Sequence, residues 1–144
     1  MTDTREGDDV TRTSSGPGEG LLLLSAAQAR AQVREVMRRC ALGLGHATVA
    51  EERVADAELA CSELLANARR HGGGLTHFAV RCEGAHVVVE VGDLSSDVPL
   101  SPPPDRLSPG GFGWALLQRV AAKTSVRVRP DGGGKTITAH LPVE

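Results

Sequence analysis

Hydrophobic residues that recur at three- and four-residue steps predict three helices in this chain. The clearest covers residues 48–71, where good helix formers surround one apolar stripe. This stripe consists of Val54, Ala57, Cys61, Leu64 and Ala68. An earlier helix is expected over residues 26–42, with Ser25 as its N-cap, and a third from Gly113 to about Lys123. Each stripe gives its helix one face that can pack against a core.

Alternating apolar and polar residues predict four strands, over residues 76–83, 86–93, 125–129 and 135–142. Glycine-containing turns join them into two hairpins. The short apolar run at residues 21–24 could add another strand. The resulting order, β-α-α-β-β-α-β-β, predicts an α+β fold. We expect a two-layer α/β sandwich in which a mostly antiparallel sheet carries helices on one face.

Two stretches lack such patterns. Residues 1–19 are rich in Thr, Ser, Gly and Asp, so we expect a disordered leader before one domain of residues 20–144. Residues 94–110 contain five prolines, three of them consecutive, which a helix or a central strand cannot accommodate. This second stretch is expected to be an exposed loop that could act as a lid.

Composition narrows the class of protein. A net charge of -2 argues against a general nucleic-acid binder, which would carry a basic surplus. No apolar run is long enough for a membrane span or a signal peptide. The three cysteines, Cys40, Cys61 and Cys82, lack partners at zinc-site spacing. We expect three buried free thiols, which would fit a reducing, cytoplasmic compartment.

Glu63 and Asn67 are the first candidate site residues. Four residues apart on a helix, they stack on one face, away from the apolar stripe. A carboxylate and an amide oxygen at this spacing could hold a water, orient a nucleophile or form one edge of a magnesium shell. A solvated helix face is the alternative interpretation.

Asp93, Gly111 and Gly113 are further candidates. Asp93 ends a valine-rich strand, where its carboxylate could accept a hydrogen bond from a ligand's amino group or form an Asx-turn. The two glycines precede a helix, whose N-terminus presents unpaired N–H groups to anions such as phosphate. The alternative for this pair is a simple turn.

The segment Gly134-Lys135-Thr136 resembles part of a P-loop but is not one. A P-loop needs a glycine where Arg129 stands and a helix after the threonine. Here a strand follows, in which Ile137, Ala139 and Leu141 alternate with Thr138 and His140. The basic stripe Arg30, Arg34 and Arg38 is interpreted as a solvated helix face, with an acidic partner as the alternative. No metal role is assigned to the scattered histidines.

Taken in order, four segments resemble the boxes of the histidine-kinase-like (GHKL, Bergerat-fold) ATPases, and among these the small bacterial anti-sigma-factor serine/threonine kinases. They are Glu63-Leu-Leu-Ala-Asn67-Ala for the N box, Asp93 for the first glycine box, Gly111-Phe-Gly113 for the second, and Gly134-Lys135-Thr136 for the last. The resemblance covers about residues 21–142.

The resemblance implies a role for each residue. Glu63 would be the general base that activates a serine hydroxyl, and Asn67 would bind Mg²⁺ bridging the phosphates of ATP. Asp93 would accept a hydrogen bond from adenine. Gly111 and Gly113 would admit the phosphates. Thr136 would support the adenine end of the pocket.

The implied function is an ATP-binding regulator that binds a sigma factor or a similar protein and phosphorylates a serine or threonine on an antagonist. The resemblance also admits a homodimer. Two positions depart from the family pattern: Ser95 stands where a glycine is usual, and Phe112 where a basic residue is common. They motivate the alternative of a catalytically silent, ATP-dependent binding module. A catalytic domain detached from a histidine kinase is a third interpretation, which the lack of a helix pair with a phosphoacceptor histidine disfavours.

Overall fold

A computed structural model describes residues 11–12, 24–99 and 113–144. In these residues it contains three helices: α2 (Ala26–Gly43), α3 (Glu51–Arg70) and α4 (Gly113–Val120). Five strands form one sheet: β1 (Thr11–Arg12), β2 (Leu75–Glu83), β3 (His86–Asp93), β4 (Lys123–Val128) and β5 (Lys135–Pro142). Their order across the sheet is β1-β2-β3-β5-β4, and every neighbouring pair is antiparallel.

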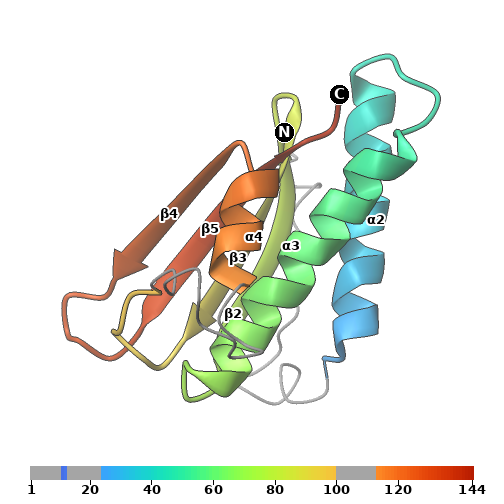
Figure 1. Cartoon of the computed structure of the whole chain (residues 1–144). Coiled ribbons are helices and arrows are strands. Elements are labelled where there is room, and N and C mark those ends of the chain that lie inside the picture. The colour runs from blue at the N-terminus through green and yellow to red at the C-terminus, as the bar shows by residue number, and fades with distance from the viewer. Residues whose placement is uncertain (1–10, 13–23, 100–112) are drawn as a thin grey trace, which may run out of the picture.

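The helices cover one face of this sheet, and α3 lies between α2 and α4 (Figure 1). The predicted two-layer α+β sandwich is therefore confirmed. Local sequence explains where α2 begins: the Ser25 hydroxyl accepts from the N–H of Gln28, whose side chain accepts from the N–H of Ser25. The predicted helix stripes and the inward faces of the strands form the core, with Phe78, Met37, Leu64 and Leu117 among its largest fully buried side chains.

Several element boundaries differ from the prediction. Helix α4 ends at Val120, and Lys123 already belongs to β4, so the third helix is shorter than expected. Thr11 and Arg12 pair with β2 although they lie inside the predicted leader. The rest of that leader lies outside the described residues, as do residues 21–23 and residues 100–110 of the predicted loop over 94–110. None of the described helices combines the length and the apolar character that a membrane span requires.

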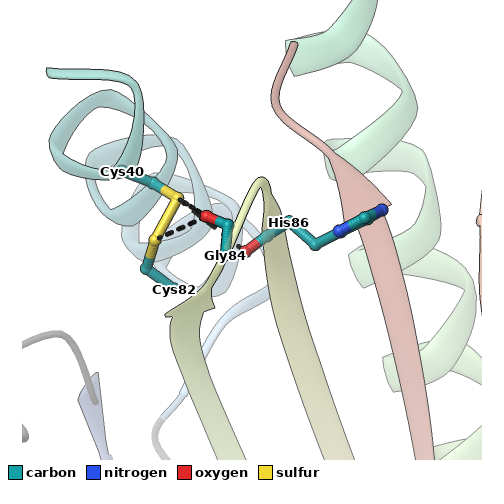
Figure 2. The surroundings of a disulfide bond; sticks show 4 residues. All are labelled: Cys40, Cys82, Gly84 and His86. Carbon is teal, nitrogen blue, oxygen red and sulfur yellow. Dashed lines mark hydrogen bonds between the residues drawn. A yellow bond between two sulfur atoms is a disulfide. The ribbon is translucent and has the colours of Figure 1, made fainter. Parts of the chain in front are cut away.

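The prediction of three free thiols is wrong for two of them. Cys40 near the end of α2 and Cys82 on β2 form a disulfide, with their Cα atoms 5.6 Å apart (Figure 2). Both sulfur atoms also lie close to the carbonyl oxygen of Gly84 in the β2–β3 turn. Both cysteines are on core-facing positions, and they meet where α2 packs against the β2–β3 hairpin. Cys61 is free and buried. The inference of a reducing compartment depended on free thiols, and it loses that support.

Candidate functional site

The turn after α3 places the end of this helix on the end of β3. The N–H of Gly72 donates to Ala68 (3.1 Å), and the N–H of Leu94 donates to the carbonyl of Gly72 (2.8 Å). A β-carbon at Gly72 would lie 2.6 Å from Asp93 Oδ2, nearer than side chains approach one another. Only a glycine therefore lets the chain pass this close to the carboxylate. This contact was not predicted from the sequence.

Asp93 faces the helix layer and is buried, with 2% of its surface exposed. Its Oδ1 accepts from the N–H of Ser95 (2.9 Å), which is the Asx-type bond that the sequence offered as the alternative interpretation. The ammonium of Lys135 lies 3.1 Å from Oδ1 and 3.0 Å from Oδ2. The carboxylate thus has a defined orientation, and Oδ2 receives fewer hydrogen bonds than Oδ1.

Ser95, which replaces the usual glycine, turns its side chain away from Asp93. Its hydroxyl accepts from the N–H of Asp97 (3.0 Å), and its carbonyl accepts from Lys135 Nζ (3.2 Å). The first turn of the loop is thereby tied to both β3 and β5. The serine hydroxyl is occupied within the loop itself.

Glu63 lies on the side of α3 that contacts α4, Asn67 follows one turn later on the same helix face, and both are half-buried. The opposite side faces α2, where Arg30 donates to Ser62 (3.2 Å) and Arg34 pairs with Glu58. Arg34 and Arg38 are exposed, as predicted for a solvated stripe on α2, whereas Arg30 is half-buried. Among the described residues, none forms an ion pair or a side-chain hydrogen bond with Glu63 or Asn67.

The carboxylate of Glu63 lies against the first residue of α4. A β-carbon added at Gly113 would collide with Glu63 Oε2, so glycine is what allows this contact. The structure thus brings together Glu63 and Gly113, two of the predicted site residues. Gly111 and Phe112 lie outside the described residues. Asn67 is one turn further along the same helix face, toward Gly72 and Asp93.

The structure does not bring Thr136 to this group. In the β3–β5 ladder Asp93 is opposite Lys135 and Gly92 is opposite Thr136. Opposed residues share a face of the sheet and successive residues alternate, so Lys135 faces the helices and Thr136 faces away from them. On that far face Glu90 accepts a hydrogen bond from Arg81 (2.7 Å) and pairs with His77.

Lys135 is the residue that the sequence reasoning missed. The signal was present, because Ile137, Ala139 and Leu141 were already assigned to one face of the strand. Continuing that alternation by two residues puts Lys135 on the core face. Its side chain is 5% exposed, which is exceptional for lysine and requires a partner such as Asp93.

Comparison with known families agrees with this geometry. The family model described as "Histidine kinase-like ATPase domain" matches residues 25–141, which include every described element except β1 and the last residue of β5. Among curated proteins, no sequence matches the chain.

Proposed function

Since the chain belongs to the family of histidine kinase-like ATPase domains, we propose that it binds Mg-ATP and transfers the γ-phosphate to a serine or threonine of another protein. Family membership implies ATP binding. What we propose beyond it is that the phosphate is transferred to a serine or threonine hydroxyl. The observation that carries it is the arrangement of Glu63 and Asn67. They are two half-buried polar side chains on one face of α3, and no described residue pairs with either.

Glu63 is suited to act on an acceptor hydroxyl. Its carboxylate lies at the start of α4, where the helix N-terminus favours negative charge, and no described cation neutralises it. An ionised carboxylate within reach of a serine can accept the hydroxyl proton as the oxygen attacks phosphorus. The γ-phosphate is then transferred to that oxygen and ADP leaves with the electron pair of the broken P–O bond.

Asn67 and Asp93 would position the nucleotide. The amide oxygen of Asn67 is a hard donor of the kind that Mg²⁺ prefers, and it is one helical turn from Glu63. Bound Mg²⁺ neutralises phosphate charge. Asp93, at the end of β3, would accept a hydrogen bond from the amino group of adenine. The partners that we propose are a sigma factor or a similar regulator and its antagonist, by analogy with the anti-sigma-factor kinases. A phosphate added to a serine in that interface would disrupt docking by charge and desolvation.

The test is transfer of label from [γ-³²P]ATP to proteins in an extract of the source cells, with calorimetric titration of Mg-ATP in parallel. Wild type should label a protein on serine or threonine. Glu63→Ala should lose transfer by a factor of about 10² or more while its affinity for Mg-ATP stays within about threefold. Asn67→Ala should weaken Mg-ATP binding itself.

The control is Glu58→Ala, which removes a carboxylate from the opposite side of the same helix, where it pairs with Arg34. It should retain transfer. Equal transfer by wild type and Glu63→Ala would refute the role of Glu63. Binding of Mg-ATP without transfer to any protein would favour the silent, ATP-dependent binding module instead.

A further inference from the structure

The buried pair of Lys135 and Asp93 is the feature of the molecule that the proposed function does not yet use. A lysine is rarely buried, because removing its charge from water is costly. Here one is 5% exposed at the start of β5, directly opposite an aspartate in the ladder. It shares its face of the strand with the buried residues Ile137 and Ala139.

The ammonium of Lys135 is held inside the structure. Nζ donates hydrogen bonds to Asp93 Oδ1 (3.1 Å) and to the carbonyl of Ser95 (3.2 Å), and it lies 3.0 Å from Asp93 Oδ2 as an ion pair. Because the side chain is 5% exposed, we expect its effect on nucleotide binding to act through Asp93.

The acceptor sites of Asp93 are not all used. Oδ1 accepts hydrogen bonds from Ser95 N–H and Lys135 Nζ, whereas Oδ2 lies 3.0 Å from Nζ as an ion pair and borders Gly72. No described residue donates a hydrogen bond to Oδ2, which leaves this oxygen with acceptor capacity for an N–H of an exocyclic amine.

We infer that Lys135 is a positioning residue for base recognition: its ion pair holds the buried carboxylate of Asp93 in one orientation, so that Oδ2 accepts from the amino group of adenine. This inference deepens the proposed function and depends on it. A charged acceptor binds an N–H more strongly than a neutral one, so the pair would select a base with an amino group over one without it.

The experiment compares two nucleotides whose only difference is that amino group. The dissociation constants of Mg-ATP and of Mg-purine riboside 5′-triphosphate are measured for wild type and Lys135→Met. Wild type should bind ATP about 10- to 100-fold more tightly, the effect of one hydrogen bond to a charged group. In Lys135→Met this ratio should fall to about threefold or less. The control is Lys123→Met, which changes the only other lysine of the chain, an exposed residue at the start of β4.

A second variant covers the case in which Lys135→Met does not fold because it leaves a buried charge unpaired. Lys135→Gln keeps an amide donor beside Asp93 without the charge, and its ratio should also fall below that of wild type. If Lys135 is only structural, Lys135→Met weakens both nucleotides equally and the ratio persists, which overturns the inference. Tighter ATP binding by Lys135→Met would also overturn it, since the lysine would then compete with adenine.

The two proposals fail in distinguishable ways. If wild type binds neither nucleotide, the proposed function fails. If it binds both equally well, nucleotide binding stands but Asp93 does not contact the amino group, and the inference about Lys135 falls.

Discussion

Single glycines decide how closely the candidate site residues approach one another. Gly72 lets the end of α3 lie on the Asp93 carboxylate, and Gly113 lets α4 begin against Glu63. Gly134, with a φ of +149°, lies against the backbone carbonyl of Asp93 at the start of β5. An added carbon at Gly134 would meet backbone, and one at Gly72 would meet the buried Asp93 side chain, so substitutions there should disturb folding. At Gly113 it would meet only the end of the Glu63 side chain, so a substitution there should act on function before it acts on folding.

Gly113→Ala should displace Glu63 without destabilising the protein. The added carbon meets Oε2, the far end of a flexible side chain, and alanine is the better helix former. We expect the rate of phosphate transfer to fall roughly 10- to 100-fold, because a small misplacement of a reacting group has an effect of this size. The affinity for Mg-ATP should change by less than about threefold. Initial rates of label transfer and calorimetry measure the two effects. Gly43→Ala is the control, because nothing lies within 4 Å of its added carbon. Full transfer by Gly113→Ala would mean that the observed position of Glu63 is irrelevant.

The same residue scale shows what the sequence could predict about the site. Glu63 and Asn67 were placed on one helix face by spacing alone, because helical geometry is local. Lys135 could also have been found, since strand alternation assigns it to the core face. Gly72 could not, because its role depends on the turn after α3 meeting a strand that is distant in the sequence.

At the scale of elements, the predicted helices and strands mostly match the structure to within a few residues. Their signals are local: a capping box at Ser25, and turns whose Gly84 and Gly132 adopt positive φ. The disulfide was missed for the opposite reason. Cys40 and Cys82 were each assigned to a core-facing pattern, but their pairing requires α2 to pack on the β2–β3 hairpin, across 42 residues of sequence.

Removing this disulfide should reduce stability and leave nucleotide binding intact. The disulfide closes a loop of 42 residues and so restricts the unfolded chain. Loss of the disulfide should therefore lower the free energy of unfolding by about 2–4 kcal/mol. Cys82 pairs with Val87 near the start of β3, whereas Asp93 is at the other end, roughly 20 Å away. Urea denaturation of Cys40→Ser/Cys82→Ser should therefore show a lower midpoint, with Mg-ATP affinity unchanged.

Reducing agent provides the matched comparison for that prediction. It should destabilise wild type to about the level of the double variant and have no effect on the variant itself. A wild type that is insensitive to reductant would show that the disulfide contributes nothing to stability.

At the scale of the whole molecule, one core joins the three helices to the sheet, and the element order predicted this architecture. The strand order β1-β2-β3-β5-β4 did not follow from local patterns, because it depends on which distant strands pair. That order places β5 beside β3 and so brings Lys135 to Asp93. The geometry of the candidate site thus depends on the strand order of the complete sheet, although each polar residue of the site can be identified from the sequence by itself.

Cys61 offers a way to measure the stability of this whole core. It is fully buried on α3, and burial raises the pKa of its thiol to about 12. The reactive thiolate is therefore scarce at neutral pH, and labelling by iodoacetamide requires the core to open. Cys40 and Cys82 do not compete while they are joined. Non-reducing mass spectrometry should show very slow labelling of the native protein and one modified cysteine after unfolding in denaturant.

Mg-ATP should slow that labelling if the nucleotide binds only the folded chain. At a ligand concentration 100 times the dissociation constant, global opening becomes less favourable by about 2.7 kcal/mol, and the labelling rate should fall about 100-fold. The dissociation constant measured by calorimetry gives the expected reduction in labelling rate at any other Mg-ATP concentration. Asn67→Ala, with weaker binding, should show proportionally less protection at the same ATP concentration. Saturating Mg-ATP without any effect on labelling would show that Cys61 is exposed by a local opening that leaves the site folded, because only openings that destroy the nucleotide site are suppressed by its ligand.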